Sequence, residues 1–128
     1  MPAAGPKTAL FPNSYRAQAA IVRARAVMRG ADANSVVQAT ANAVCLGIAE
    51  DNQQNLTRPL RVADRPGENT FGEAGAAFAL DALLTPDANG RLITCTTTQN
   101  VAAIARQAAT ALGDLVSVEI APRGQKAP

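Results

Sequence analysis

Histidine and tryptophan are both absent from this 128-residue sequence, and aromatic residues make up only 3% of it. Without histidine the chain lacks the most frequent general base, the usual partner of a nucleophilic serine or cysteine, and the most frequent metal ligand. Its two lysines, Lys7 and Lys126, lie near the ends of the chain, where we do not expect catalytic side chains. The sequence therefore predicts a protein that is not an enzyme, with no catalytic, cofactor-binding or metal site.

Long apolar runs and clustered cysteines are also missing. No stretch approaches the roughly 18 apolar residues that span a bilayer, so no membrane segment is expected. Cys45 and Cys95 stand far apart, each among apolar or β-branched neighbours. We interpret each as a small buried hydrophobic residue rather than a reactive thiol, and the sequence leaves open whether they form a disulfide.

The length and composition predict one domain with two extensions. Hydrophobic residues make up 48% of the chain, but many are alanine, so the core must be built from Val, Ile, Leu and Ala. Residues 1–15 are rich in proline and show no periodicity, which indicates an extended N-terminal arm. We expect a single β-rich domain over residues 16–121 and a flexible C-terminal tail over residues 122–128.

Charge is distributed unevenly along the chain. Residues 1–31 carry five basic side chains and no acidic one, whereas the rest holds seven basic and ten acidic side chains. A basic N-terminal segment on a mildly acidic body could attach to an acidic surface or to nucleic acid, and it could equally be a solvated face.

A short pattern occurs twice, in residues 26–37 and again in residues 82–93. Each copy has an apolar run, then Asp-Ala-Asn, then a second apolar pair. Asp and Asn fold onto their own backbone, and the Asn-Gly pair of the second copy is a strong hairpin signal. Further apolar or alternating segments follow at residues 44–49 and 60–63 in the first copy and at residues 101–105 and 115–120 in the second. The sequence thus predicts a mainly β fold, a compact β-sandwich or barrel made of two similar halves.

Helical spacing competes with this prediction in two places. Residues 14–30 and 100–112 carry apolar side chains at helical intervals, with a glycine where each helix would end. Alanine is abundant in this chain, and its high helix propensity exaggerates the helical pattern. The segment of the first copy that corresponds to residues 101–105 contains Gly47, which disfavours a helix. We therefore expect strands over residues 24–29 and 101–105, and the helical alternatives stay open.

Two segments resemble binding loops only superficially. The run from Asp87 begins like a calcium loop, but Arg91 and Thr98 occupy positions where that loop needs ligands. The glycine-rich residues 72–75 contain Glu73, which would repel phosphate. We interpret the first segment as a turn, and residues 64–69 and 72–75 as loops.

Several segments together resemble a known family. Residues 74–77 (Ala-Gly-Ala-Ala) and 81–92 (Asp-Ala-Leu-Leu-Thr-Pro-Asp-Ala-Asn-Gly-Arg-Leu), with residues 45–49 and 112–118, resemble the small capsid decoration (cement) proteins of tailed bacteriophages. The resemblance covers roughly residues 24–121 and rests on turns and alternating apolar residues. It implies a compact β-domain that binds the outside of an assembled capsid, clamps neighbouring subunits and has no catalytic residues.

The resemblance also implies partners and a location. The partners would be the major capsid protein and further copies of this chain, as a trimer in preference to a dimer, on the capsid exterior of a virion assembled in the host cytoplasm. From their place in the basic segment we expect the interface residues to be Phe11, Tyr15, Arg16, Arg23 and Arg25. The alternative is a small β-barrel module that binds nucleic acid with this segment, which so few aromatic residues support poorly.

Overall fold

The computed structural model describes residues 14–52 and 59–128, and over these residues it contains ten β-strands and no helix. The first five strands are β1 (Ser14–Ala17), β2 (Ala26–Arg29), β3 (Ser35–Gln38), β4 (Gly47–Ala49) and β5 (Pro59–Ala63). The second five are β6 (Asn69–Glu73), β7 (Leu83–Pro86), β8 (Leu92–Thr94), β9 (Ala103–Ala105) and β10 (Leu115–Ile120). The prediction of a mainly β fold is confirmed, and strands rather than helices form at both ambiguous segments.

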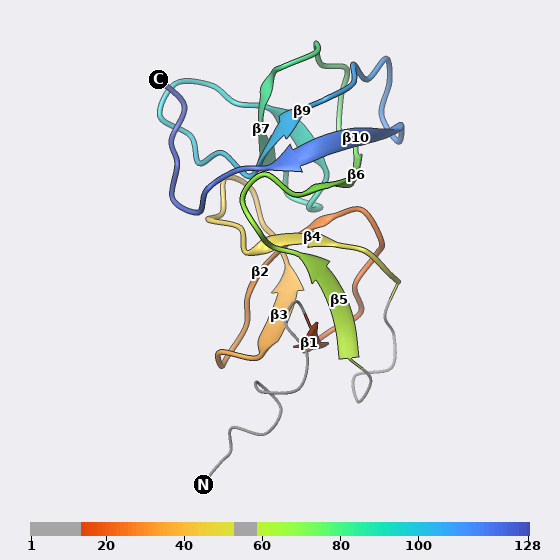
Figure 1. Cartoon of the computed structure of the whole chain (residues 1–128), viewed down its shortest axis with the longest axis vertical. Helices are drawn as coiled ribbons and strands as arrows, with labels where there is room; N and C mark the ends of the chain where they lie inside the picture. Colours follow the sequence, from red (N-terminus) through yellow and green to blue (C-terminus); the bar gives the residue numbers. More distant parts are fainter. Residues whose placement is uncertain (1–13, 53–58) are drawn as a thin grey trace, which may run out of the picture.

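The strands form two halves that are stacked in Figure 1. Strands β1 to β5 close a barrel in the order β1-β3-β2-β4-β5, in which β1 pairs antiparallel with β5 and parallel with β3. Strands β6 to β10 form a second sheet in the order β6-β10-β9-β7-β8. The predicted barrel is therefore the first half of the molecule.

The second sheet repeats the connections of the barrel. If the barrel is opened between β1 and β3, its order reads β1-β5-β4-β2-β3, which matches β6-β10-β9-β7-β8 strand by strand. The pairing that closes the barrel survives in the second half as a single parallel bridge between Ala74 and Leu92. The two halves are thus similar, and each includes a strand, β1 or β6, ahead of the predicted repeat.

The repeat extends to single hydrogen bonds. The amide of Ala24 donates to the carbonyl of Ala49 at 2.8 Å, and the equivalent amide of Asp81 donates to Ala105 at 2.9 Å. Both donors have left-handed backbones, with φ of 70° and 68°. Such φ values are uncommon outside glycine, so their recurrence marks a shared bend before β2 and β7.

The Asp-Ala-Asn segments form the predicted hairpin turns. Between β2 and β3, the amide of Asn34 donates to Oδ1 of Asp32 at 2.9 Å. Between β7 and β8, the amide of Asn89 donates to Oδ1 of Asp87 at 2.8 Å. Both turns have the side-chain-to-backbone bond that makes Asp and Asn favourable in turns.

Residues 72–75 were predicted as a loop, and this prediction is wrong for Gly72 and Glu73, which end strand β6. Glycine is required at position 72 for packing, because a Cβ there would lie 2.6 Å from Cδ1 of Leu92. A glycine in a strand often marks such a close approach, and here it was mistaken for a turn signal.

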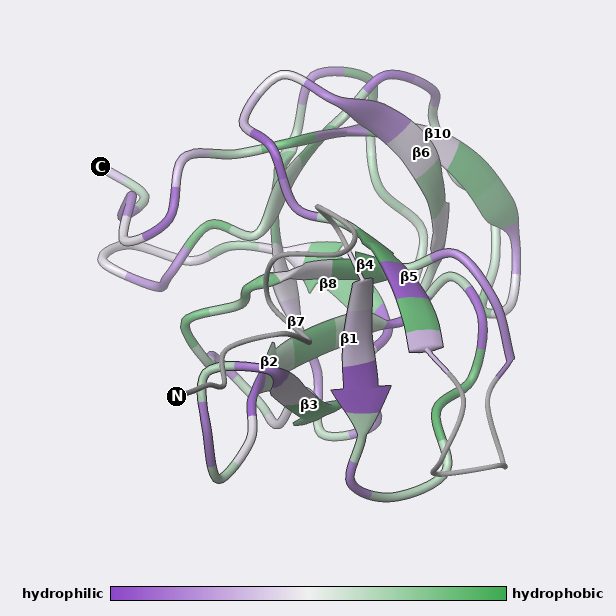
Figure 2. Cartoon of the chain, turned by 60° about the horizontal axis from the view of Figure 1, so that its bottom comes forward, coloured by the Kyte–Doolittle hydropathy of each residue, from purple (hydrophilic) through white to green (hydrophobic). Residues whose placement is uncertain are grey.

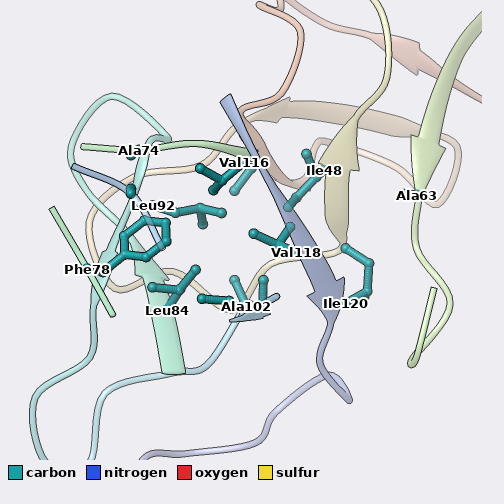
Figure 3. Packing of buried hydrophobic residues seen from close by; sticks show 14 of the residues in the cluster. Ile48, Ala63, Ala74, Phe78, Leu84, Leu92, Ala102, Val116, Val118 and Ile120 are labelled. Atoms are coloured by element: carbon teal, nitrogen blue, oxygen red, sulfur yellow. The ribbon is translucent and has the colours of Figure 1, made fainter. Parts of the chain in front are cut away.

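The larger core cluster joins the two halves. Ile48 from β4 points toward Val116 and Val118 of β10 in Figure 3, and all three side chains are buried. A separate cluster fills the barrel with Val, Ile, Leu and Ala side chains, among them Val27, Leu46 and Leu60. The core thus consists of the residue types that the composition predicted, and it continues across the junction between the halves.

The last residues of the chain pack against the loop before β9. The amide of Val101 donates to the carbonyl of Gln125 at 2.8 Å, and Ala127 is buried together with Val101 and Ala121.

No helix long and apolar enough to cross a membrane occurs in residues 14–52 and 59–128.

Thr85 on β7 provides a test of this packing. It is fully buried, and its hydroxyl has no hydrogen-bond partner among the described residues. Replacing an unsatisfied buried hydroxyl by a methyl of the same shape removes a desolvation penalty, so we expect Thr85→Val to raise the free energy of unfolding by about 1 kcal/mol. Urea denaturation would measure it.

Thr94→Val on neighbouring β8 is the matched control, because Thr94 is exposed and the change should shift stability by less than about 0.5 kcal/mol. A clear loss of stability in Thr85→Val would show that the hydroxyl has a partner, such as a buried water.

Candidate interaction surfaces

Two of the predicted interface residues lie on β1, where successive side chains face opposite sides. The hydroxyl of Tyr15 donates a hydrogen bond to Oδ2 of Asp64 at 2.6 Å and its ring packs against the barrel core. Burial, followed by this bond, raises the pKa of the Tyr15 hydroxyl to about 12. Arg16 faces solvent and forms an ion pair with Asp32 at 3.2 Å. Tyr15 therefore anchors β1 to the segment after β5, and Arg16 stays accessible.

The remaining predicted residues are separated from these two. The backbone amide of Arg23 donates to Oδ1 of Asn52 at 2.8 Å, and its exposed side chain has no acidic partner among the described residues. Phe11 lies outside the described residues. The predicted set thus does not gather into one patch: Arg16 lies beside the β2–β3 turn, and Arg23 lies beside the loop after β4.

Arg25 lies at the junction of the halves. Its Nε donates to Oε1 of Glu73 at 3.1 Å, and Nε of Arg91 donates to Oε2 of the same carboxylate at 2.7 Å. Only 17% of the Arg25 side chain is exposed, so little of it remains for an outside partner. Burial alone would raise the pKa of Glu73, but hydrogen bonds from the two arginines outweigh it and hold that pKa below its usual value.

Backbone hydrogen bonds reinforce this junction. The amide of Glu73 donates to the carbonyl of Ala24, and the amide of Ala26 donates to Gly90, both at 2.8 Å. Gly90 has φ of +77°, and a Cβ there would lie 2.9 Å from Cγ of Gln38. The second Asp-Ala-Asn turn, which ends at Gly90, is therefore docked against the first half.

An apolar patch covers the outer side of β6 and β10. Phe71 and Leu115 lie diagonally across this strand pair, Phe71 opposite Ser117 and Leu115 opposite Glu73. Together with Leu112 they are 50–63% exposed. Figure 2 shows β6 and β10 side by side. Leu112 precedes Leu115 by three residues in the chain. Exposed large apolar side chains often mark contact surfaces, and we name Phe71, Leu112 and Leu115 the β6–β10 patch.

The sequence contained a signal for this patch that was not used. In β10, which was predicted over the correct residues, Leu115 is out of phase with the buried Val116, Val118 and Ile120. An apolar residue on the polar side of an alternating strand is a candidate surface contact. Its partner Phe71 was hidden because β6 was not predicted.

The described part of the chain contains two cysteines and several carboxylates that could in principle act as ligands or nucleophiles. Cys45 and Cys95 are both free, and burial raises the pKa of the Cys45 thiol to about 12. Over residues 14–52 and 59–128, no group of three or more His, Cys, Asp or Glu side chains could hold a metal ion.

Charge separates the two halves. Residues 1–63 hold seven basic and three acidic side chains, and residues 64–128 hold five basic and seven acidic ones, which gives net charges of +4 and −2. The basic half includes Tyr15, Arg16 and Arg23, and the acidic half includes the β6–β10 patch. The first half is therefore net basic, and the exposed apolar side chains Phe71, Leu112 and Leu115 belong to the net acidic half.

Comparison with solved structures finds a similar fold. The chain is similar to the head fiber gp8.5 N base of bacteriophage phi29, with a TM-score of 0.68 and 19% sequence identity over 84% of this chain and 91% of that chain. No protein-family model matches the chain, and no curated protein matches it either. The similarity shows that the two chains share a fold over almost their whole lengths.

The junction generates a prediction. Glu73→Gln removes the negative charge that two partly covered arginines share, and breaking one partner of a buried ion pair is strongly destabilising. Because these side chains keep 14–25% exposure, we expect a loss of about 2 kcal/mol at pH 7, measured by urea denaturation. Glu119→Gln, which breaks the exposed pair with Arg106, should cost under about 1 kcal/mol.

The pH dependence of this effect has a definite sign. Because folding lowers the pKa of Glu73, its stabilisation is complete above the unfolded pKa of about 4.3 and is lost as the pH falls through the folded value. The difference in the free energy of unfolding between wild type and Glu73→Gln should therefore decrease below about pH 4. A gap that is small at pH 7, or that does not depend on pH, would contradict this role.

Proposed function

We propose that this chain is a non-enzymatic structural protein of a tailed-bacteriophage virion, which attaches to the outside of the capsid and stabilises contacts between major capsid subunits. The observation that carries the proposal is the fold similarity to the phi29 head fiber base, which extends over 84% of this chain and 91% of that one. The resemblance of its sequence to capsid decoration proteins supports the same role. The side chains described above, which form contacts without a catalytic set, are compatible with it.

We assign capsid attachment to the basic half. Arg16 and Arg23 are exposed, and Arg23 has no acidic partner among the described residues. Tyr15 fixes β1, the strand that follows the segment with Phe11 in the sequence. Exposed charges of this kind mainly set the rate and salt dependence of association. On a capsid, contacts that are weak individually become strong when an oligomer makes several at once.

We assign self-association to the β6–β10 patch. Its three large apolar side chains are exposed and belong to the acidic half, whereas the residues assigned to the capsid belong to the basic half. An oligomer that buries this patch would still present its basic halves to a shell. A homotrimer is the assembly we favour over a dimer, placed on the capsid exterior.

Capsid attachment can be tested by cosedimentation with homologous capsids. Removing both exposed charges in the double variant Arg16→Gln/Arg23→Gln should weaken binding roughly fivefold, which corresponds to about 1 kcal/mol. The control Arg106→Gln removes an exposed charge from the acidic half and should bind as wild type does. No binding of the wild-type protein to capsids at any salt concentration would refute the proposal. Retention of DNA at low salt, with a steep salt dependence, would support the nucleic-acid alternative instead.

Self-association can be tested by light scattering coupled to size exclusion. Leu112→Glu places a charge in the apolar patch, so we expect the wild-type oligomer to dissociate to monomers. Leu80→Glu is the matched control, because Leu80 is similarly exposed, at 59% against 63%, and lies outside the patch. If both variants keep the wild-type mass, the patch is not the contact between copies.

A further inference from the structure

A hollow opens where the mouth of the barrel meets the C-terminal segment. Its volume is about 240 Å³, and it is lined by Arg29, Val44, Leu46 and Arg123. Arg29 lies two residues after Val27 in β2, so the two side chains are on the same face of the strand. Val27 packs in the barrel core. Leu46 belongs to the same core. The hollow is therefore the end of the barrel interior, a place where β-barrels often bind ligands.

Within residues 14–52 and 59–128, both arginines at this hollow lack a carboxylate partner. Five arginines form ion pairs within the described residues, at positions 16, 25, 61, 91 and 106. Arg29 donates only to the carbonyl of Ala33 at 3.3 Å, and no hydrogen bond from the Arg123 side chain occurs among the described residues. Guanidinium groups have five donors each, so most of their hydrogen-bonding capacity is unused here.

The surroundings keep the hollow cationic. Arg29 and Arg123 both line the hollow, so their two positive charges lie at the same site. Asp64 is the neighbouring carboxylate, but its Oδ2 accepts the Tyr15 hydroxyl, and it forms no ion pair with either arginine. Two positive charges thus face the hollow without direct neutralisation.

The apolar lining limits what the hollow could take. Val44 is 49% exposed, and Leu46 is buried at 6%. A small inorganic anion would satisfy the arginines but leave Val44 uncovered. The volume is below the roughly 300–1,000 Å³ of a typical small-molecule site, so it suits a side chain or two rather than a larger ligand. Base stacking is also disfavoured, because the nearby aromatic, Tyr15, is packed against the core.

We propose that this hollow is a docking site for an acidic segment of a partner protein, in which a Glu or Asp carboxylate meets Arg29 and Arg123 while an adjacent aliphatic side chain covers Val44. Arginine pairs carboxylates bidentately, with directional hydrogen bonds. One arginine comes from each half of the chain, so the bound segment would join the halves. This proposal is independent of the capsid proposal, because it is argued only from the side chains that line the hollow.

The test is an NMR titration of the full chain with the dipeptide N-acetyl-Leu-Glu-amide. We expect saturable shifts at residues 29, 44, 46 and 123, with a Kd on the order of 1 mM. N-acetyl-Leu-Gln-amide, which lacks the carboxylate, should bind at least about tenfold more weakly. Inorganic phosphate should also bind more weakly, because it cannot cover the apolar lining.

Variants locate the site. Arg123→Gln should weaken dipeptide binding about tenfold while leaving the fold intact, because its exposed side chain holds no other described residue. Arg106→Gln is the control and should bind as wild type does. The proposal is overturned if no saturable shifts occur at these four positions, if the Gln dipeptide or phosphate binds as tightly as the Glu dipeptide, or if Arg123→Gln binds normally. Capsid cosedimentation is read separately, so either proposal can fail alone.

Discussion

Directional hydrogen bonds hold the two halves in one orientation, and one carboxylate supplies the charged pair of them. Glu73 accepts a hydrogen bond from Arg25 of the first half and another from Arg91 of the second. The apolar contacts across the junction are non-directional and include many alanines, so they would tolerate sliding more readily than a hydrogen-bonded charge with fixed geometry. Because Arg29 and Arg123 come from different halves, the hollow between them exists only in this orientation.

The two halves share a backbone pattern but use equivalent positions differently. The parallel pairing of Ala17 with Val36 corresponds to the bridge between Ala74 and Leu92, so Arg16 and Glu73 occupy equivalent places. In the first half this position is at the surface, where Arg16 is half exposed. In the second half it is at the junction, and the charge is reversed. The two halves thus share a backbone scaffold, but at this equivalent position Arg16 remains at the surface and Glu73 packs at the junction.

The sequence could predict those parts of the fold that rest on local chemistry. The Asp-Ala-Asn turns depend on a side chain bonding to an amide two residues later, and β10 depends on alternation, so both were predicted correctly. Strand β6 was missed because Gly72 is needed for a contact with Leu92, a residue twenty positions away. The ion pair of Arg25 and the hollow at Arg123 were equally hidden, since each joins residues that only the fold brings together. A basic segment in sequence thus became several separate sites in space.

The proposed function relies on this separation of sites. A single patch serves one contact, whereas this molecule places a basic surface on one half and an apolar patch on the other. Contacts of different chemistry do not compete for the same partner, because an apolar face gains little from a charged surface and an arginine gains little from an apolar one. When copies associate through the apolar patch, the basic surfaces are held at a fixed spacing. Each further attachment is then intramolecular, and modest individual affinities multiply. This gain in affinity requires a rigid junction at Glu73, because two loosely joined halves would not keep the basic and the apolar surfaces at a fixed relative position.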